Sequence, residues 1–219
     1  MLRNDGIWMH NFLPGNYNNL KDIVLFLDRD GIINKDTGYP HKPEHIQLLP
    51  DIARLISFAK STQQWHVAVV TNQSGIGHGY YNWDSFAKVQ DHIYEQLESL
   101  NGLRFGGIDL VMACPFHEKG LSDYKVADHF YRKPNPGMLL EAGEILRAKM
   151  NRSWIVGDKL SDMKAGYRAG VAGGFLVAAP PEIKQQINKL RLFDNFTLYC
   201  VETLNEIIDI FNANPDVES

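Results

Sequence analysis

The sequence predicts an α/β fold, a doubly wound parallel sheet built as a single domain. Short apolar runs alternate along the chain with longer amphipathic segments, the rhythm of strands followed by crossover helices. The runs at 23–27 and 67–70 are apolar without interruption, as in strands buried on both faces of a parallel sheet. The length of 219 residues suits one domain with a substantial core.

Each predicted element has a local signal. Pro50 opens a helix whose apolar residues Ile52, Leu55 and Ile56 lie on one face. Asp84 is suited to the N-cap or first turn of the next helix, and Gly170 to the end of a later one. The predicted strands are 23–27, 67–70, 108–113, 153–156, 174–178 and 197–201. The predicted helices are 50–60, 84–100, one from Pro134–Pro136 to 149, 161–169, 182–189 and a last one ending at Phe211.

Two polar connections, 33–49 and 114–134, are long for a compact domain, which favours a functional role for them. Neither is long enough for a separate cap domain, so we expect a capless, open active face suited to a small or accessible substrate. Residues 1–20, rich in Asn and Gly, are expected to form an irregular lead-in, with the domain itself at 21–219.

Composition excludes several classes of protein. With 44% hydrophobic and 22% charged residues the chain is typical of soluble globular proteins. The net charge of −4 provides no broad basic field for nucleic acid or an anionic membrane. No apolar run approaches a membrane span, and the start of the chain lacks a signal peptide, so we expect a cytoplasmic protein. Two cysteines fit a reducing compartment. For the assembly, we expect a monomer or a small homo-oligomer.

The first strand ends in two carboxylates, Asp28 and Asp30, with Gly31 behind them. Like charges this close repel one another, so the pattern favours a divalent cation, or a phosphate beside a metal. Asp28 could attack phosphorus as a nucleophile, and Asp30, on the same side of an extended chain, could act as general acid and base. Taken alone, Asp-x-Asp-Gly could equally be a turn after a strand.

Other predicted strands end in polar residues at the same sheet edge. Thr71 and Asn72 can donate hydrogen bonds to phosphate oxygens, although Thr-Asn is also a common strand exit. Lys133, just before a helix, can neutralise a transferring phosphoryl group, or be an ordinary solvated lysine. Asp158 offers a carboxylate to a hard cation. Asp162 either offers a second carboxylate to that cation or is a first-turn residue favoured by the helix dipole.

This order of residues resembles the haloacid dehalogenase (HAD) superfamily of phosphotransferases, over about residues 24–177. Longer motifs make the chain similar to the D-glycero-D-manno-heptose 1,7-bisphosphate phosphatases, whose near relatives are the histidinol-phosphate phosphatases. The motifs that carry the resemblance are Asp28-Arg29-Asp30-Gly31 with Asn34, Gly38-Tyr39-x-His41, 70–76, Cys114-Pro115, 132–139 and 156–163.

The resemblance implies a Rossmann-like HAD fold and a magnesium-dependent sugar-phosphate phosphatase. It implies that Asp28 is nucleophile and metal ligand, that the Asp30 carbonyl also binds Mg²⁺, and that Asp158 completes the metal site. It further implies that the phosphoryl group or substrate is bound by Thr71, Asn72, Lys133, Arg132, Lys159 and His41. The heptose enzymes supply precursors of bacterial surface polysaccharide, which implies a similar role here.

Two departures from the family pattern stand out. Ile32 replaces the usual Thr after Asp-Arg-Asp-Gly. The positions of the family's structural zinc loop hold Cys114, Phe116, His129 and Tyr131. His117 could join Cys114 and His129 after a shift of the loop, with Asp123 or Asp128 as a fourth ligand, but a closed site needs four converging ligands. We therefore expect no stoichiometric zinc and a loop held by aromatic packing.

Two other functions remain open from the sequence. Histidinol phosphate is the nearest alternative substrate. A receiver-type phosphate-binding module that does not turn over is the alternative of a different class, and Lys133 with the full set of strand-end residues favours turnover over it.

Overall fold

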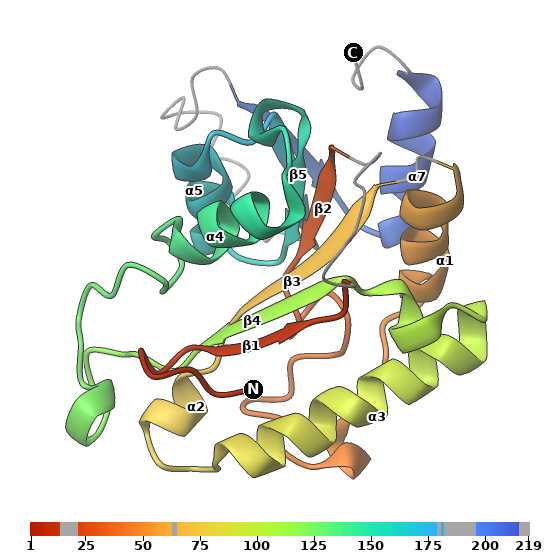
Figure 1. The fold of residues 1–219 in the computed structure, drawn as a ribbon. Helices are drawn as coiled ribbons and strands as arrows, with labels where there is room; N and C mark the ends of the chain where they lie inside the picture. The colour runs from red at the N-terminus through yellow and green to blue at the C-terminus, as the bar shows by residue number, and fades with distance from the viewer. Residues whose placement is uncertain (14–21, 63–64, 179–180, 182–195, 215–219) are drawn as a thin grey trace.

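A computed structural model describes residues 1–13, 22–62, 65–178, 181 and 196–214. Its centre is a seven-stranded sheet in the order β1-β4-β3-β2-β5-β6-β7 (Figure 1). All neighbours in the sheet are parallel except β1, which pairs antiparallel with β4. The strands are β1 (Trp8–Asn11), β2 (Val24–Leu27), β3 (His66–Asn72), β4 (Leu110–Cys114), β5 (Trp154–Gly157), β6 (Gly173–Val177) and β7 (Thr197–Val201).

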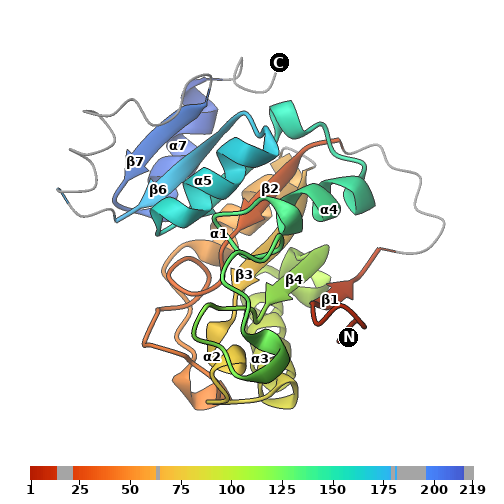
Figure 2. The same ribbon diagram turned by 90° about the vertical axis from the view of Figure 1, so that its left-hand side faces the viewer.

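Helices cover both faces of the sheet, as Figure 2 shows from the side. The helices are α1 (Ile52–Ser57), α2 (Ser74–Gly77), α3 (Trp83–Asn101), α4 (Gly137–Leu146), α5 (Leu160–Ala169) and α7 (Leu204–Ala213). Residues of α1, α3 and α7 pack on one face and residues of α4 and α5 on the other. This arrangement confirms the predicted doubly wound α/β fold.

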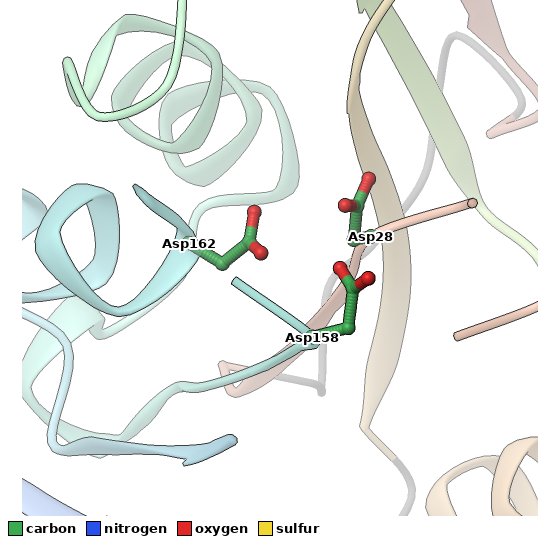
Figure 3. A group of neighbouring side chains, drawn as sticks. All are labelled: Asp28, Asp158 and Asp162. Carbon is green, nitrogen blue, oxygen red and sulfur yellow. The ribbon is translucent and has the colours of Figure 1, made fainter. Parts of the chain in front are cut away.

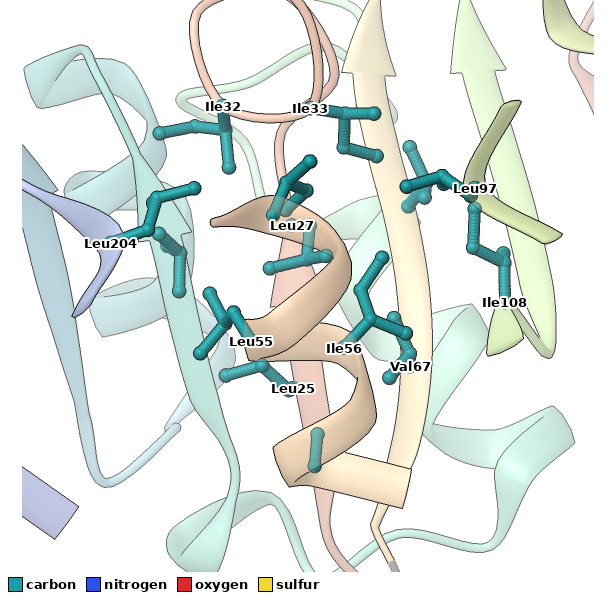
Figure 4. Close-up of a cluster of buried hydrophobic side chains, with 14 of the residues drawn as sticks. Leu25, Leu27, Ile32, Ile33, Leu55, Ile56, Val67, Leu97, Ile108 and Leu204 are labelled. Atoms are coloured by element: carbon teal, nitrogen blue, oxygen red, sulfur yellow. The ribbon is translucent and has the colours of Figure 1, made fainter. Parts of the chain in front are cut away.

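The central strand β2 divides its side chains between the two cores. Leu25 and Leu27 point towards α1, where they meet Leu55 (Figure 4), and Val24 and Phe26 join the opposite cluster. Alternation of side chains along a strand explains why this run is apolar at every position. The chain then emerges at Asp28, whose backbone N–H donates to the carbonyl of Val156 in β5 at 3.0 Å.

Some boundaries differ from those predicted. Residues 1–20 were expected to be irregular, but Trp8–Asn11 form the edge strand β1. Asn82 caps α3 by accepting a hydrogen bond from the N–H of Ser85, and Asp84 lies in the first turn, the second of the two positions predicted for it. Helix α4 ends at Leu146 instead of 149, because Arg147 adopts a left-handed conformation. The helix predicted at 182–189 lies outside the described residues.

The connections after β2 and β4 contain only short 3-10 turns, at Pro43–His45 and Ser122–Tyr124, within the described part of the chain. At the carboxyl ends of β2 and β4 the described chain therefore carries loops and no inserted domain. Among the described residues, none of the helices combines the length and apolar character that crossing a membrane requires.

Candidate active site

A cavity of about 350 Å³ opens at the carboxyl edge of β2 and β3. It collects most of the predicted site residues, which the chain separates by up to 131 positions, from Asp28 to Lys159. Its lining consists of Asp28, Asp30, Asp36, Gly38, Tyr39, Thr71, Asn72, Gln73, Ser74, Tyr81, Lys133, Lys159, Ser161 and Asp162.

Three carboxylates converge at this edge of the sheet, and two of them, Asp28 and Asp162, line the cavity. Asp28, Asp158 and Asp162 each offer an oxygen, and these oxygens lie within 4.8 Å of one another (Figure 3). Asp28 follows β2, and the other two come from the end of β5 and the first turn of α5. The Oδ1 atom of Asp158 is buried and accepts no hydrogen bond from the described residues. Such a cluster of oxygens fits a hard divalent cation such as Mg²⁺.

Close packing of these carboxylates depends on two glycines. A Cβ atom at Gly31 would lie 2.4 Å from Oδ2 of Asp158, and one at Gly157 would lie 2.4 Å from Cβ of Asp162. Gly31 also has a φ of +95°, which L side chains rarely adopt. The Asp-x-Asp-Gly motif thus requires glycine at position 31, because any side chain there would collide with the Asp158 carboxylate.

Lys133 provides the opposite charge. Its Nζ atom lies 3.0 Å from Oδ1 of Asp28 and 2.6 Å from Oδ1 of Asp162, and the residue is only 2% exposed. Burial alone would lower the pKa of Lys133, but the two carboxylates outweigh burial and raise it. Lys133 is therefore a permanent cation inside the site, and the solvated lysine considered from the sequence is not what the structure shows.

Asp28 is the carboxylate most affected by its surroundings. Burial raises its pKa to about 7, with further contributions from the charges of Asp162 and Asp158 and opposition from Lys133. Burial also raises the pKa of Asp158. The protein without metal thus holds excess negative charge that a cation would neutralise.

Asp30 is not one of the three converging carboxylates, and its side chain accepts hydrogen bonds from a network of donors. The buried Arg29 binds it with two hydrogen bonds, from Nε at 3.0 Å and from Nη2 at 2.9 Å. Asn34 Nδ2 donates to its Oδ1 and Gln73 Nε2 to its Oδ2, each at 2.9 Å. Tyr81 donates to Gln73 Oε1 at 2.6 Å and completes the network.

Arg29, Gln73 and Tyr81 were not among the predicted site residues. Arg29 stands between two aspartates in the sequence, and the guanidinium lies 5.1 Å from the ring of Phe86 in α3. Its place between the two aspartates of the motif was the available signal. Nothing local in the sequence marks Tyr81.

Thr71 and Asn72 end β3 beside the carboxylates. The Thr71 hydroxyl accepts a hydrogen bond from Gln73 Nε2 at 2.9 Å and lines the cavity. Asn72 makes a reciprocal pair with the backbone of Lys133: its Nδ2 donates to the carbonyl at 2.9 Å, and its Oδ1 accepts from the N–H at 3.0 Å. Asn72 therefore holds Lys133 in place.

Of the remaining predicted substrate-binding residues, Lys159 is in the lining of the cavity and His41 and Arg132 are not. Lys159 lines the cavity, and its Nζ lies 3.0 Å from Oδ2 of Asp36 and 3.6 Å from Oδ2 of Asp158. His41 lies outside the lining, stacked on Tyr81 with ring centroids 5.4 Å apart. Arg132 also lies outside it and donates from Nη1 to the carbonyl of Phe116 at 2.9 Å.

The loop at the predicted zinc positions is packed with aromatic rings. Phe116 stacks on His129 with centroids 3.6 Å apart, and Tyr124 meets the same Phe116 edge to face. His117 pairs with the ring of His78 instead, at 4.7 Å. Within the described residues, the three aspartates above form the one group of three or more metal-type ligands, and it does not include Cys114, His117 or His129.

Comparison with known proteins relates the chain to a family of hydrolases. The family described as HAD-hydrolase-like matches residues 130–179. A D-glycero-β-D-manno-heptose-1,7-bisphosphate 7-phosphatase from Mesorhizobium japonicum is 50% identical over 154 residues, which cover 70% of this chain and 69% of that protein.

Two solved structures share the fold. A HAD-like phosphatase from Mesorhizobium loti superposes with a TM-score of 0.81 and 39% identity, over 99% of this chain and 95% of that one. The D,D-heptose 1,7-bisphosphate phosphatase from B. bronchiseptica, solved with magnesium and phosphate, has a TM-score of 0.70 and 24% identity, over 88% of this chain and 99% of that one.

Proposed function

Because this chain belongs to the HAD-type phosphatases that include the heptose bisphosphate relatives, and is a phosphoric monoester hydrolase, we propose that its substrate is D-glycero-D-manno-heptose 1,7-bisphosphate. It removes the phosphate on C7 and thereby supplies precursors of surface polysaccharide. One observation carries the proposal: Asp28, Asp162 and Lys133 line one cavity together with Thr71, and Asp158 joins the two aspartates there. The chain is 50% identical over 154 residues to such an enzyme.

The reaction begins with Asp28. One of its oxygens attacks phosphorus, the bond from phosphorus to the C7 oxygen breaks, and an aspartyl phosphate forms. Lys133, 3.0 Å from Asp28, balances the negative charge that develops on the phosphoryl oxygens, and the Thr71 hydroxyl donates to one of them. Water then attacks phosphorus, which releases phosphate and restores Asp28.

Asp30 transfers the protons in this scheme. It protonates the departing C7 oxygen in the first step and accepts a proton from water in the second. Both Asp30 oxygens already accept two hydrogen bonds each, from Arg29, Asn34 and Gln73. Proton transfer at Asp30 therefore requires one of these donors to be released.

Magnesium fits the three carboxylates that face one another. Asp28 and Asp158 would hold the ion, with the carbonyl of Asp30, and Asp162 would compensate Lys133 beside it. When bound, the ion supplies positive charge that binds the substrate phosphate and lowers repulsion against the attacking carboxylate. The unpartnered Oδ1 of Asp158 is the ligand atom that this proposal explains.

A substrate panel tests the proposal. The α and β anomers of heptose 1,7-bisphosphate, histidinol phosphate and p-nitrophenyl phosphate are compared by phosphate release with Mg²⁺ and with EDTA. We expect the highest kcat/KM for a heptose bisphosphate and loss of activity in EDTA. An equal kcat/KM for p-nitrophenyl phosphate would contradict the heptose assignment, preference for histidinol phosphate would replace it, and absence of all turnover would favour a receiver-type binding module.

A further inference from the structure

Residues 1–11 pack along the edge of the sheet beside the loop that leads to the active site. β1 pairs with β4 in antiparallel register, with Trp8 opposite Ala113 and Asn11 opposite Leu110. Leu2 forms an isolated antiparallel β-bridge with Trp8, and the Ile7 side chain is fully buried. Because β4 ends at Cys114, this segment, which we call the N-terminal clamp, lies next to the start of the 114–131 loop.

The clamp contacts both ends of that loop. Gly6 lies against Phe116, close enough that a Cβ atom would be 3.0 Å from Cζ of that ring. The Arg3 guanidinium lies 5.8 Å from the ring of Tyr131, which directly precedes Arg132. Arg3 is also ion-paired with Glu141 of α4, and both side chains are mostly buried. A cation over an aromatic ring, fixed by a second charge, restricts the position of Tyr131.

Phe116 connects these contacts to Arg132. The ring of Phe116 lies between Gly6 and the stacked ring of His129, and its carbonyl accepts the hydrogen bond from Nη1 of Arg132. The other guanidinium nitrogens of Arg132 donate no hydrogen bond to the described residues. Arg132 directly precedes Lys133, which lines the cavity.

Lys133 is held by a different set of contacts. Asn72 binds its backbone in both directions, and Asp28 and Asp162 hold its Nζ. Loss of the clamp should therefore release Arg132 without moving Lys133. This separation allows the clamp to affect substrate binding while the chemical step stays intact.

We propose that the N-terminal clamp is a positioning element for Arg132, the residue that the resemblance to the heptose bisphosphate phosphatases implies as a substrate contact. The proposal rests on the proposed bisphosphate substrate. Arg3 is its positioning residue: it acts through Tyr131 and Glu141 and does not itself touch substrate. A guanidinium pre-oriented on a carbonyl suits recognition of a phosphate group.

Steady-state kinetics of Arg3→Ala test the proposal. We expect KM for heptose 1,7-bisphosphate to rise about tenfold, and kcat and KM for p-nitrophenyl phosphate to stay within about twofold, since the latter lacks the sugar bisphosphate that Arg132 would contact. Arg3→Lys, which keeps the charge beside Glu141, should restore most of the KM. Lys149→Ala, which removes an ion pair with Asp22 elsewhere on the surface, is the matched control and should change neither substrate.

A double-mutant cycle with Arg132→Ala makes the test specific. If Arg3 acts through Arg132, adding Arg3→Ala to Arg132→Ala produces no further rise in KM. Additive effects, or equal losses on both substrates, would overturn the proposal.

Limited trypsin digestion reports on the clamp without any substrate. We expect faster cleavage after Lys125, which is exposed in the 114–131 loop, in Arg3→Ala than in the wild type or Lys149→Ala. If the wild type does not hydrolyse the bisphosphate but cleavage is accelerated, the substrate assignment fails and the positioning of Arg132 stands. If the bisphosphate is hydrolysed and neither KM nor cleavage changes, the clamp has no such role.

Discussion

Asp28 and Lys133 illustrate how single residues in this site depend on one another. The aspartate is buried beside two other carboxylates, and the lysine lies between Asp28 and Asp162. A buried charge without a partner is costly, so neither residue would be tolerated alone. Their pairing keeps two opposite charges 3.0 Å apart, and both residues are buried.

Replacing the nucleophile should separate activity from stability. We expect Asp28→Asn to lower kcat by about 100-fold or more, because an amide cannot form the aspartyl phosphate. Its melting temperature should hold or rise, because the change removes repulsion with Asp158 and leaves Lys133 paired with Asp162. Phosphate release and thermal melting measure the two effects.

Asp209→Asn, on the exposed side of α7, is the matched control and should keep full activity. If Asp28→Asn retained more than a few percent of wild-type activity, the assignment of Asp28 as nucleophile would be wrong.

At the scale of elements, the site is formed where strand ends meet loops. β3 contributes Thr71 and Asn72, and the loop before α4 contributes Lys133. The reciprocal pair between Asn72 and the Lys133 backbone joins these two elements. This pair of hydrogen bonds matters because Lys133 precedes α4, and α4 packs on the opposite face of the sheet from α1.

Removing this pair of hydrogen bonds should impair catalysis through Lys133. We expect Asn72→Ala to lower kcat more than it raises KM, and to destabilise the fold by about 1–3 kcal/mol, because a backbone N–H and a carbonyl lose their partner. Asn205→Ala, which removes an exposed contact with Arg54, is the control and should do neither. Kinetics and denaturant unfolding test this. A change confined to KM would instead favour the direct phosphate contact that the sequence suggested for Asn72.

The 114–131 loop leads to a prediction about zinc. Burial raises the pKa of the Cys114 thiol to about 12, so the thiolate that zinc requires is disfavoured. Stacking of Phe116 on His129 and packing of Tyr131 under Arg3 hold the loop by other means. We predict no stoichiometric zinc in protein purified without chelator. About one zinc per chain by elemental analysis, lost in Cys114→Ser, would show this account of the loop to be wrong.

For the whole molecule, the sheet and its two cores bring several charged side chains to a single edge. Three carboxylates face one lysine there, and metal binding should therefore couple to global stability. The ordinary pKa of an aspartate is 3.8, and that of Asp28 is about 7 in the folded protein. The contribution of protonated Asp28 to the free energy of unfolding is fully present below about pH 4 and is lost as the pH rises through about 7.

Magnesium should thus stabilise the protein most at high pH. In EDTA we expect the melting temperature to fall between about pH 4 and 7 by more in the wild type than in Asp28→Asn. At a Mg²⁺ concentration about tenfold above its dissociation constant, the melting temperature should rise by about 3–5 °C at pH 8 and hardly at pH 5. The gain should disappear in Asp158→Asn and persist in Asp209→Asn. A gain independent of pH would contradict a site made of these carboxylates.

The sequence alone was enough to predict the α/β fold, the central strand, and the residues at the strand ends. Apolar runs that permit burial on both faces, followed by polar residues, leave few alternatives for Asp28, Thr71 and Asp158. The helix boundaries at Arg147 and Asn82 were less accessible, because they depend on a left-handed residue and on one side-chain hydrogen bond. The pattern of the first twenty residues was too weak to reveal β1, whose strand character comes from pairing with β4.

The sequence by itself determined which chemical groups the site contains, because local apolar pattern and turn residues place them at the ends of strands. Only the tertiary structure decided what each group does there. It directed Asp30 into the Arg29 network, made Asp162 a partner of Lys133, turned Asn72 towards the Lys133 backbone, and laid the N-terminal clamp against the loop before Arg132. These contacts join residues far apart in the chain, so their energies depend on how the elements pack.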